Sequence, residues 1–95
     1  MSYKLKFLPL SKKEWLKLDI TIQNQFKKKL SKRLQNPKIQ KDKLSGYNNI
    51  YKIKLRSAGF RLVYEVKDKE IVVLVLSVGK RENGAVYTKV EERSK

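Results

Sequence analysis

The 95-residue sequence contains no histidine and no cysteine. Without histidine, the chain lacks the usual general acid or base of enzymes and the most common metal ligand. Without cysteine, it has no disulfide bond, thiolate zinc site or cysteine nucleophile. Long apolar segments are missing too. The longest wholly apolar run covers only residues 71–76, too few to cross a bilayer, and residues 1–6 lack the apolar stretch expected of a signal peptide. We therefore expect a cytoplasmic protein with no metal, no cofactor and no membrane contact.

Acidic residues are scarce. Nine Asp and Glu stand against 24 Lys and Arg, which gives a formal net charge of +15. Such an excess attracts polyanions over long range, so a nucleic acid is the first candidate partner and an acidic protein the second. Hydrophobic residues make up 40% of the chain, which is enough for one modest core and excludes a disordered basic tail. Residues 1–95 are predicted to form a single domain.

The first part of the chain predicts a strand and two helices. Residues 3–7 alternate between apolar and polar side chains, as a short strand does. Ser11 and Glu14 have the spacing of a capping box, which predicts a helix over residues 12–18. Asp19 begins a second predicted helix, and proline after Asn36 ends it. The apolar residues of this second helix, four apart, should face the core, with its lysines in solvent. They are Ile22, Phe26, Leu30 and Leu34.

In the second part of the chain, apolar and polar residues alternate with a period of two. Residues 50–56 and 60–67 alternate, which predicts two strands that are each covered on one side. The continuous run at 71–76 predicts a central strand buried on both faces, and residues 85–93 predict a short last helix. The expected fold class is α+β, with the order β-α-α-β-β-β-α. A helical hairpin should pack on a small, mainly antiparallel sheet.

The first two strands of this meander place cations across from one another. If their apolar residues share one face, the loop between them, at residues 56–59, must hold two or four residues. Either loop places Lys54 opposite Arg61. Lys52 then lies opposite Val63, and all four are expected on the side away from the core. Like charges directly across a sheet are destabilising, so either a bound polyanion explains them or they only solubilise an exposed face.

Three segments have a pattern seen in a known family. They read YKIKLRS at residues 51–57, GFRLVY at 59–64 and SVGKRE at 77–82, followed by Val86 and Tyr87. Together with Trp15 and the lysines of the second helix, they closely resemble the RelE toxins of the RelE/ParE superfamily. The likeness extends along nearly the whole chain.

The resemblance implies a RelE/ParE-like fold and the toxin component of a bacterial type II toxin–antitoxin system. It implies an endoribonuclease that enters the ribosomal A site and cuts mRNA without a metal, inhibiting translation. The RNA 2′-OH attacks the adjacent phosphate and leaves a cyclic phosphate and a 5′-OH. The implied partners are a RelB-like antitoxin, ribosomal RNA, A-site mRNA and, through the antitoxin, operator DNA.

The resemblance also implies roles at matching positions. Lys52 and Lys54 would lie beside the 2′-OH and the phosphate, and Arg61 would stabilise the phosphorane. Arg81 would be the candidate general acid, and Tyr87 would stack on a base. Two further cations are expected to contact the substrate, Arg56 and Lys80.

Ordinary pKa values limit these roles. A lysine with a pKa near 10.4 is a poor base at neutral pH, but neighbouring cations disfavour its protonation and should lower its pKa. Which lysine acts as the base stays open. Arg81 is a weak acid, so it can instead stabilise the leaving oxygen electrostatically. Two other functions need only part of this set: a non-catalytic RNA- or ribosome-binding protein, and a ParE-like inhibitor of a DNA-processing enzyme.

Overall fold

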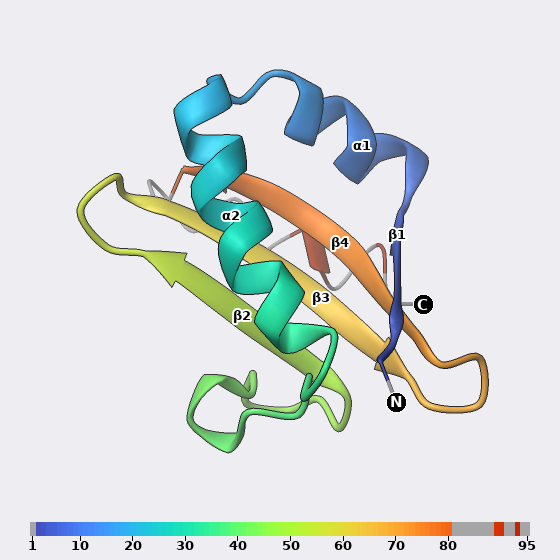
Figure 1. Ribbon diagram of the computed structural model, residues 1–95. Coiled ribbons are helices and arrows are strands. Elements are labelled where there is room, and N and C mark those ends of the chain that lie inside the picture. The colour runs from blue at the N-terminus through green and yellow to red at the C-terminus, as the bar shows by residue number, and fades with distance from the viewer. Residues whose placement is uncertain (1, 81–88, 91–92, 94–95) are drawn as a thin grey trace.

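A four-stranded sheet forms the centre of the computed structural model, which describes residues 2–80, 89–90 and 93. The strands lie in the order β1-β4-β3-β2, and both helices cover one face of the sheet (Figure 1). The elements are β1 (Lys4–Phe7), α1 (Pro9–Leu16), α2 (Ile20–Arg33), the 3₁₀ turn η1 (Gln40–Asp42), β2 (Ile50–Leu55), β3 (Phe60–Lys67) and β4 (Val72–Lys80).

The sheet is mixed. β1 runs parallel to β4, whereas the pairs β2–β3 and β3–β4 are antiparallel. This confirms the predicted α+β fold with a mainly antiparallel sheet and a helical hairpin on it. Of the last helix predicted over residues 85–93, residues 85–88 and 91–92 lie outside the described part of the chain. Lys89, Val90 and Arg93 are helical.

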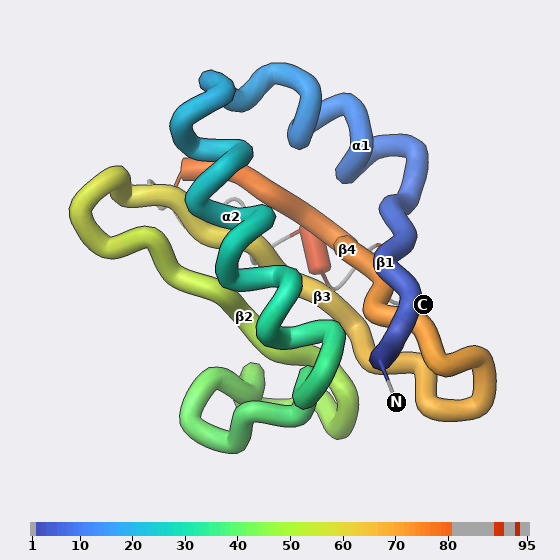
Figure 2. Tube along the Cα trace, in the orientation of Figure 1, coloured from blue at the N-terminus to red at the C-terminus, as the bar shows by residue number. Residues whose placement is uncertain are grey.

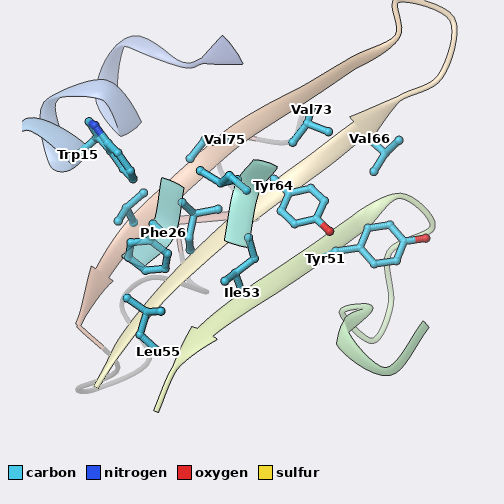
Figure 3. Packing of buried hydrophobic residues seen from close by; sticks show 12 residues of the cluster. Trp15, Phe26, Tyr51, Ile53, Leu55, Tyr64, Val66, Val73 and Val75 are labelled. Atoms are coloured by element: carbon cyan, nitrogen blue, oxygen red, sulfur yellow. The ribbon is translucent and has the colours of Figure 1, made fainter. Parts of the chain in front are cut away.

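The main core lies between the two helices and the sheet (Figure 3). Phe26 and Leu30 of α2 are buried in it, and Ile22 and Leu34 pack at its border, so the predicted apolar face is confirmed. Burying a side chain of this kind contributes roughly 1.5–3 kcal/mol. The buried members of this first cluster are Trp15, Phe26, Leu30, Tyr51, Ile53, Leu55, Leu62, Tyr64, Val66, Val73, Val75 and Val78.

The opposite face of the sheet carries a second cluster. Val63 is fully buried there and packs with Ile50, Leu76 and Val90. Val63 neighbours Leu62, a residue of the first cluster, so alternation along β3 puts it on the far face. The prediction that these strands are covered on one side only was therefore wrong, because Val90 covers part of the far face.

A β-bulge in β4 lets one strand serve both clusters. Val63 lies opposite Ser77, but Tyr64 lies opposite Val75, so Leu76 is an extra residue in β4. Strict alternation would put positions 75 and 78 on opposite faces. The bulge resets the alternation, so both belong to the first cluster while Leu76 joins the second.

Helix α1 begins earlier than predicted. Pro9 occupies its first turn, where the N–H that proline lacks would have no partner within the helix. Ser11 therefore lies inside the helix, and its hydroxyl donates to the carbonyls of Leu8 (3.0 Å) and Val75 (2.7 Å). The capping-box prediction was wrong, and the carboxylate of Glu14 has a different set of partners, described below.

Candidate active site

The β2–β3 hairpin brings together three of the predicted site residues. Lys54 lies directly opposite Arg61, as the parity of the loop predicts. The connection is the four-residue turn at 56–59, closed by a hydrogen bond from the Gly59 N–H to the Leu55 carbonyl (2.8 Å). Gly59 has φ +71°, a conformation that glycine adopts without strain. In Figure 2 this turn lies clear of α2.

Lys52, Lys54 and Arg61 share the face of the sheet that points away from the helices. Lys52 lies opposite Val63, which belongs to the second cluster on that face. Side chains directly opposite one another have Cβ atoms about 4.5–5.5 Å apart, and Lys52 and Lys54 are about 7 Å apart along the strand. Three cations are thus within reach of a single phosphodiester.

Arg61 is the most buried of the three, with 8% of its surface exposed. Its Nη1 donates to the Phe60 carbonyl (3.3 Å). Across the β3–β4 pair lies Gly79. Apart from its two chain neighbours, no described atom lies within 4 Å of where a Cβ at that position would be.

The neighbouring cations change the acidity of the Lys54 side chain. The charge of Lys52 lowers the pKa of Lys54 below its ordinary value, and partial desolvation lowers it further. Arg61 and Arg56 act in the same direction. The predicted direction is thus confirmed for one lysine, because a neighbouring positive charge disfavours the protonated form.

Removing the neighbouring charge tests this origin of the shift. In the variant Lys52→Met, the pKa of Lys54 is expected to rise towards its ordinary value, because the largest repulsion on its protonated form is gone. NMR titration of the Lys54 side-chain nitrogen measures it. Lys69→Met removes the same charge from the exposed β3–β4 turn and should leave the titration unchanged. An equal or lower pKa in Lys52→Met would contradict the assignment.

Two cations of α2 hold the edge strand that carries the lysines. Arg33 Nη1 donates to the Lys52 carbonyl (3.2 Å), and Lys29 Nζ donates to the Lys54 carbonyl (3.4 Å). The sequence suggested only solvated side chains on this helix. A lysine or arginine has the same sequence signal whether it lies in solvent or reaches a neighbouring strand, so no pattern in the sequence identified these two.

Arg33 also fixes the loop beside the site. Its Nη2 forms an ion pair with Asp42 of η1, and its Nη1 donates to the Tyr64 hydroxyl (2.9 Å), which in turn donates to the Pro37 carbonyl (2.6 Å). Next to this network is a groove of about 530 Å³. It is lined by Lys29, Arg33, Lys41, Asp42, Ile53, Lys54 and Arg56. One carboxylate among five cations leaves this groove strongly positive.

The remaining predicted site residues are placed differently. Arg56 is exposed in the hairpin turn. Lys80 lies opposite Phe60, which packs against the first cluster, so register puts Lys80 on the helix-covered face rather than with Lys54. Arg81 and Tyr87 lie outside the described residues.

Acidic side chains are sparse near this cluster. Among the described residues, no three Asp or Glu side chains lie together in a way that could hold a metal ion.

None of the helices that the structure describes is long and apolar enough to span a membrane.

Comparison with known proteins identifies the family. The profile of the family described as "ParE toxin of type II toxin-antitoxin system, parDE" matches residues 5–84. The mRNA interferase toxin RelE of Escherichia coli (strain K12) is 50% identical over 98% of both chains. The chain belongs to the RelE/ParE toxin family. The resemblance seen in the sequence is thereby confirmed.

Solved structures of the family have the same fold. An arginine-to-alanine double mutant of the E. coli toxin RelE in the free state superposes with a TM-score of 0.91, at 49% identity over 98% of both chains. RelE in the intact E. coli RelBE toxin–antitoxin complex gives a TM-score of 0.83 at 51% identity, covering 86% of this chain and all of that one. The hairpin that carries Lys54 and Arg61 thus belongs to the fold of this toxin family.

Proposed function

We propose that this protein is the toxin of a type II toxin–antitoxin system and acts as a ribosome-dependent, metal-independent endoribonuclease on mRNA in the A site. The observation that carries the proposal is the Lys54–Arg61 pair with Lys52 beside it, in a chain 50% identical to a protein named mRNA interferase. The lowered pKa of Lys54 favours it as the base, because a lower pKa leaves more of its amine neutral at a given pH.

Cleavage then proceeds as an intramolecular transesterification of the RNA phosphodiester. Lys54 takes the proton of the 2′-OH, the 2′-oxygen bonds to the adjacent phosphorus, and the bond from phosphorus to the 5′-oxygen breaks. Arg61 and Lys52 stabilise the extra negative charge of the phosphorane. Arg81 stabilises the leaving 5′-oxygen electrostatically while water protonates it, since the pKa of arginine is too high for proton donation. The products are a 2′,3′-cyclic phosphate and a 5′-OH.

Charge and partners agree with this role. The net charge of +15 attracts the protein to ribosomal RNA, with an affinity that falls as salt rises, and a toxin that acts on ribosomes would work in the cytoplasm. Tyr87 is assigned to stack on a base of the codon, and Arg56, exposed in the hairpin turn, to contact the RNA. A RelB-like antitoxin is the cognate inhibitor and links the toxin to operator DNA.

Programmed ribosomes with an empty A site test the activity. Purified protein is expected to cut the mRNA at codon-phased positions, mapped from the new 5′ ends, and to act weakly or not at all on free RNA, because the ribosome positions the substrate. A 2′-deoxy nucleotide at the cut position should abolish cleavage, and Arg81→Ala should reduce it. Cleavage that persists at the 2′-deoxy position would exclude the mechanism.

The same assay separates the other two functions. A non-catalytic ribosome-binding protein would block translation and leave the mRNA intact. The matched family description names a ParE toxin. A ParE-like toxin that inhibits a DNA-processing enzyme would leave programmed ribosomes unaffected. Either result would replace the nuclease proposal.

A further inference from the structure

The edge of β4 is incompletely covered by its neighbouring strand. β1 pairs with β4 only as far as Phe7 opposite Val75. Beyond that point, no strand in the described part of the chain lies beside β4 on this edge. The Leu76 carbonyl and the Val78 N–H point outwards there, and an open strand edge needs other partners for such groups.

One carboxylate of α1 occupies this open edge. Glu14 Oε1 accepts the Val78 N–H (3.1 Å). The same carboxylate forms a two-pronged pair with Arg93, joining Oε1 to Nη1 and Oε2 to Nη2 at 3.0 Å each. Lys89 Nζ donates to Oε2 (2.7 Å), and Arg93 Nη1 also donates to the Leu76 carbonyl (2.8 Å). The α1 helix, the edge of β4 and the C-terminal segment thus meet at one side chain.

This ion cluster is partly withdrawn from water. The side chains of Glu14 and Arg93 are 18% and 12% exposed, so water screens the pair less than it screens an exposed one. Burial alone raises the pKa of Glu14, but the hydrogen bonds from Arg93, Lys89 and the Val78 N–H outweigh it and leave the pKa below its ordinary value. The carboxylate is therefore charged at neutral pH.

Among the described C-terminal residues Lys89, Val90 and Arg93, Val90 makes an apolar attachment besides this ionic one. Val90 is fully buried in the second cluster, beside Val63 and Leu76. Lys89 and Arg93 are both helical, lie four residues apart in the sequence, and both contact Glu14. The bonds of Lys89 and Arg93 to Glu14 and to the Leu76 carbonyl thus add polar attachments to the apolar one at Val90.

We propose that Glu14 is a positioning residue that fixes the C-terminal segment in the arrangement needed for RNA cleavage, an inference that rests on the proposed function. Tyr87 precedes Lys89 by two residues in the sequence, and two residues span at most about 7 Å. Holding Lys89 and Arg93 therefore limits the region that Tyr87 can reach. Glu14 itself lies on α1, on the far side of the β4 edge from Lys54, and touches no RNA in this scheme.

Glu14→Gln, which removes the charge but keeps the shape, tests the proposal. Hydrogen exchange of the peptide covering residues 85–95 is expected to quicken by about 10- to 100-fold, while peptides from α2, β2 and β3 keep their wild-type rates. In single-turnover cleavage on programmed ribosomes, the maximum rate should fall about 10-fold or more. The half-saturating ribosome concentration should stay within about twofold, because the cationic surface is intact.

Two further variants isolate the contact. Asp68→Asn is the matched control, since Asp68 also accepts from two side chains, Lys38 and Tyr3, but away from the C-terminal segment; it should change neither readout. Arg93→Met should reproduce both effects. Adding Glu14→Gln to Arg93→Met should then slow cleavage less than it does in the wild type, because the partner is already gone.

Each outcome supports or overturns the anchoring and positioning roles of Glu14. Unchanged exchange of residues 85–95 in Glu14→Gln overturns the anchor, and faster exchange with an unchanged cleavage rate overturns the positioning role. If Glu14→Gln loosens the whole protein, Arg93→Met decides on the same two readouts. If the wild type itself does not cleave, the proposed function fails and the positioning role fails with it, while the exchange measurement still decides on its own whether Glu14 holds the segment.

Discussion

Lys54→Met is expected to lower the maximum rate of A-site mRNA cleavage by about 100- to 10,000-fold, the usual contribution of a general base. Lys54 combines the geometry and the acidity for this role. It lies opposite Arg61, and the charge of Lys52 lowers its pKa. Methionine keeps most of the length of the side chain and removes only the group that takes the proton.

The measurement is single-turnover cleavage on programmed ribosomes, with Lys69→Met as the control for the loss of one charge. That control should retain the wild-type rate, since Lys69 lies in the exposed turn after β3. If Lys54→Met cleaves as fast as the control, Lys54 is not the base.

The pH dependence follows from the same assignment. The rate should rise with pH as Lys54 loses its proton, and the lowered pKa places that rise at lower pH than for an isolated lysine. In Lys52→Met the rise should move to higher pH, because the pKa of Lys54 moves up. A rise that stays in place or moves to lower pH in Lys52→Met would contradict Lys54 as the base.

Arg61→Ala is expected to lower the cleavage rate by about 100- to 1,000-fold, as the loss of one preorganised donor to a transition-state charge does in other enzymes. Arg61 is largely buried, so its guanidinium is held in place before the substrate arrives. Ribosome affinity should change little, because Arg61 supplies one of 24 cations.

Burial of Arg61 makes a stability control necessary. Thermal unfolding should show that Arg61→Ala remains folded at the assay temperature. Arg61→Lys keeps the charge and most of the stem, and it should still lose at least about 10-fold in rate, because an ammonium lacks the planar fork of donors. A folded Arg61→Ala that cleaves at the wild-type rate would remove Arg61 from the mechanism.

Local pattern was enough to predict the hairpin. The alternation in β2 and β3 fixes which residues share a face, and the parity of the loop then fixes the pairing. The position of Lys54 directly opposite Arg61 was therefore predictable from the sequence. The apolar residues of α2 were predictable for the same kind of reason, since four-residue spacing puts them on one side of a helix.

Contacts between distant segments were not predictable. The burial of Val63 depends on Val90, and the predicted last helix has too few apolar residues to signal such a contact. The β-bulge at Leu76 has no sequence signal in a run of apolar residues. The role of Glu14 was misread because a capping box and a tertiary ion cluster need the same residue type.

The position of β2 has one further consequence. It is one of the two edge strands of the described sheet, and an exposed edge strand can pair with another chain and start aggregation. Here the outward carbonyls of Lys52 and Lys54 already accept from Arg33 and Lys29. A second copy would have to break these bonds and bring lysine against lysine. Arg33 and Lys29, together with the lysines of β2, therefore resist self-association of the toxin along this edge.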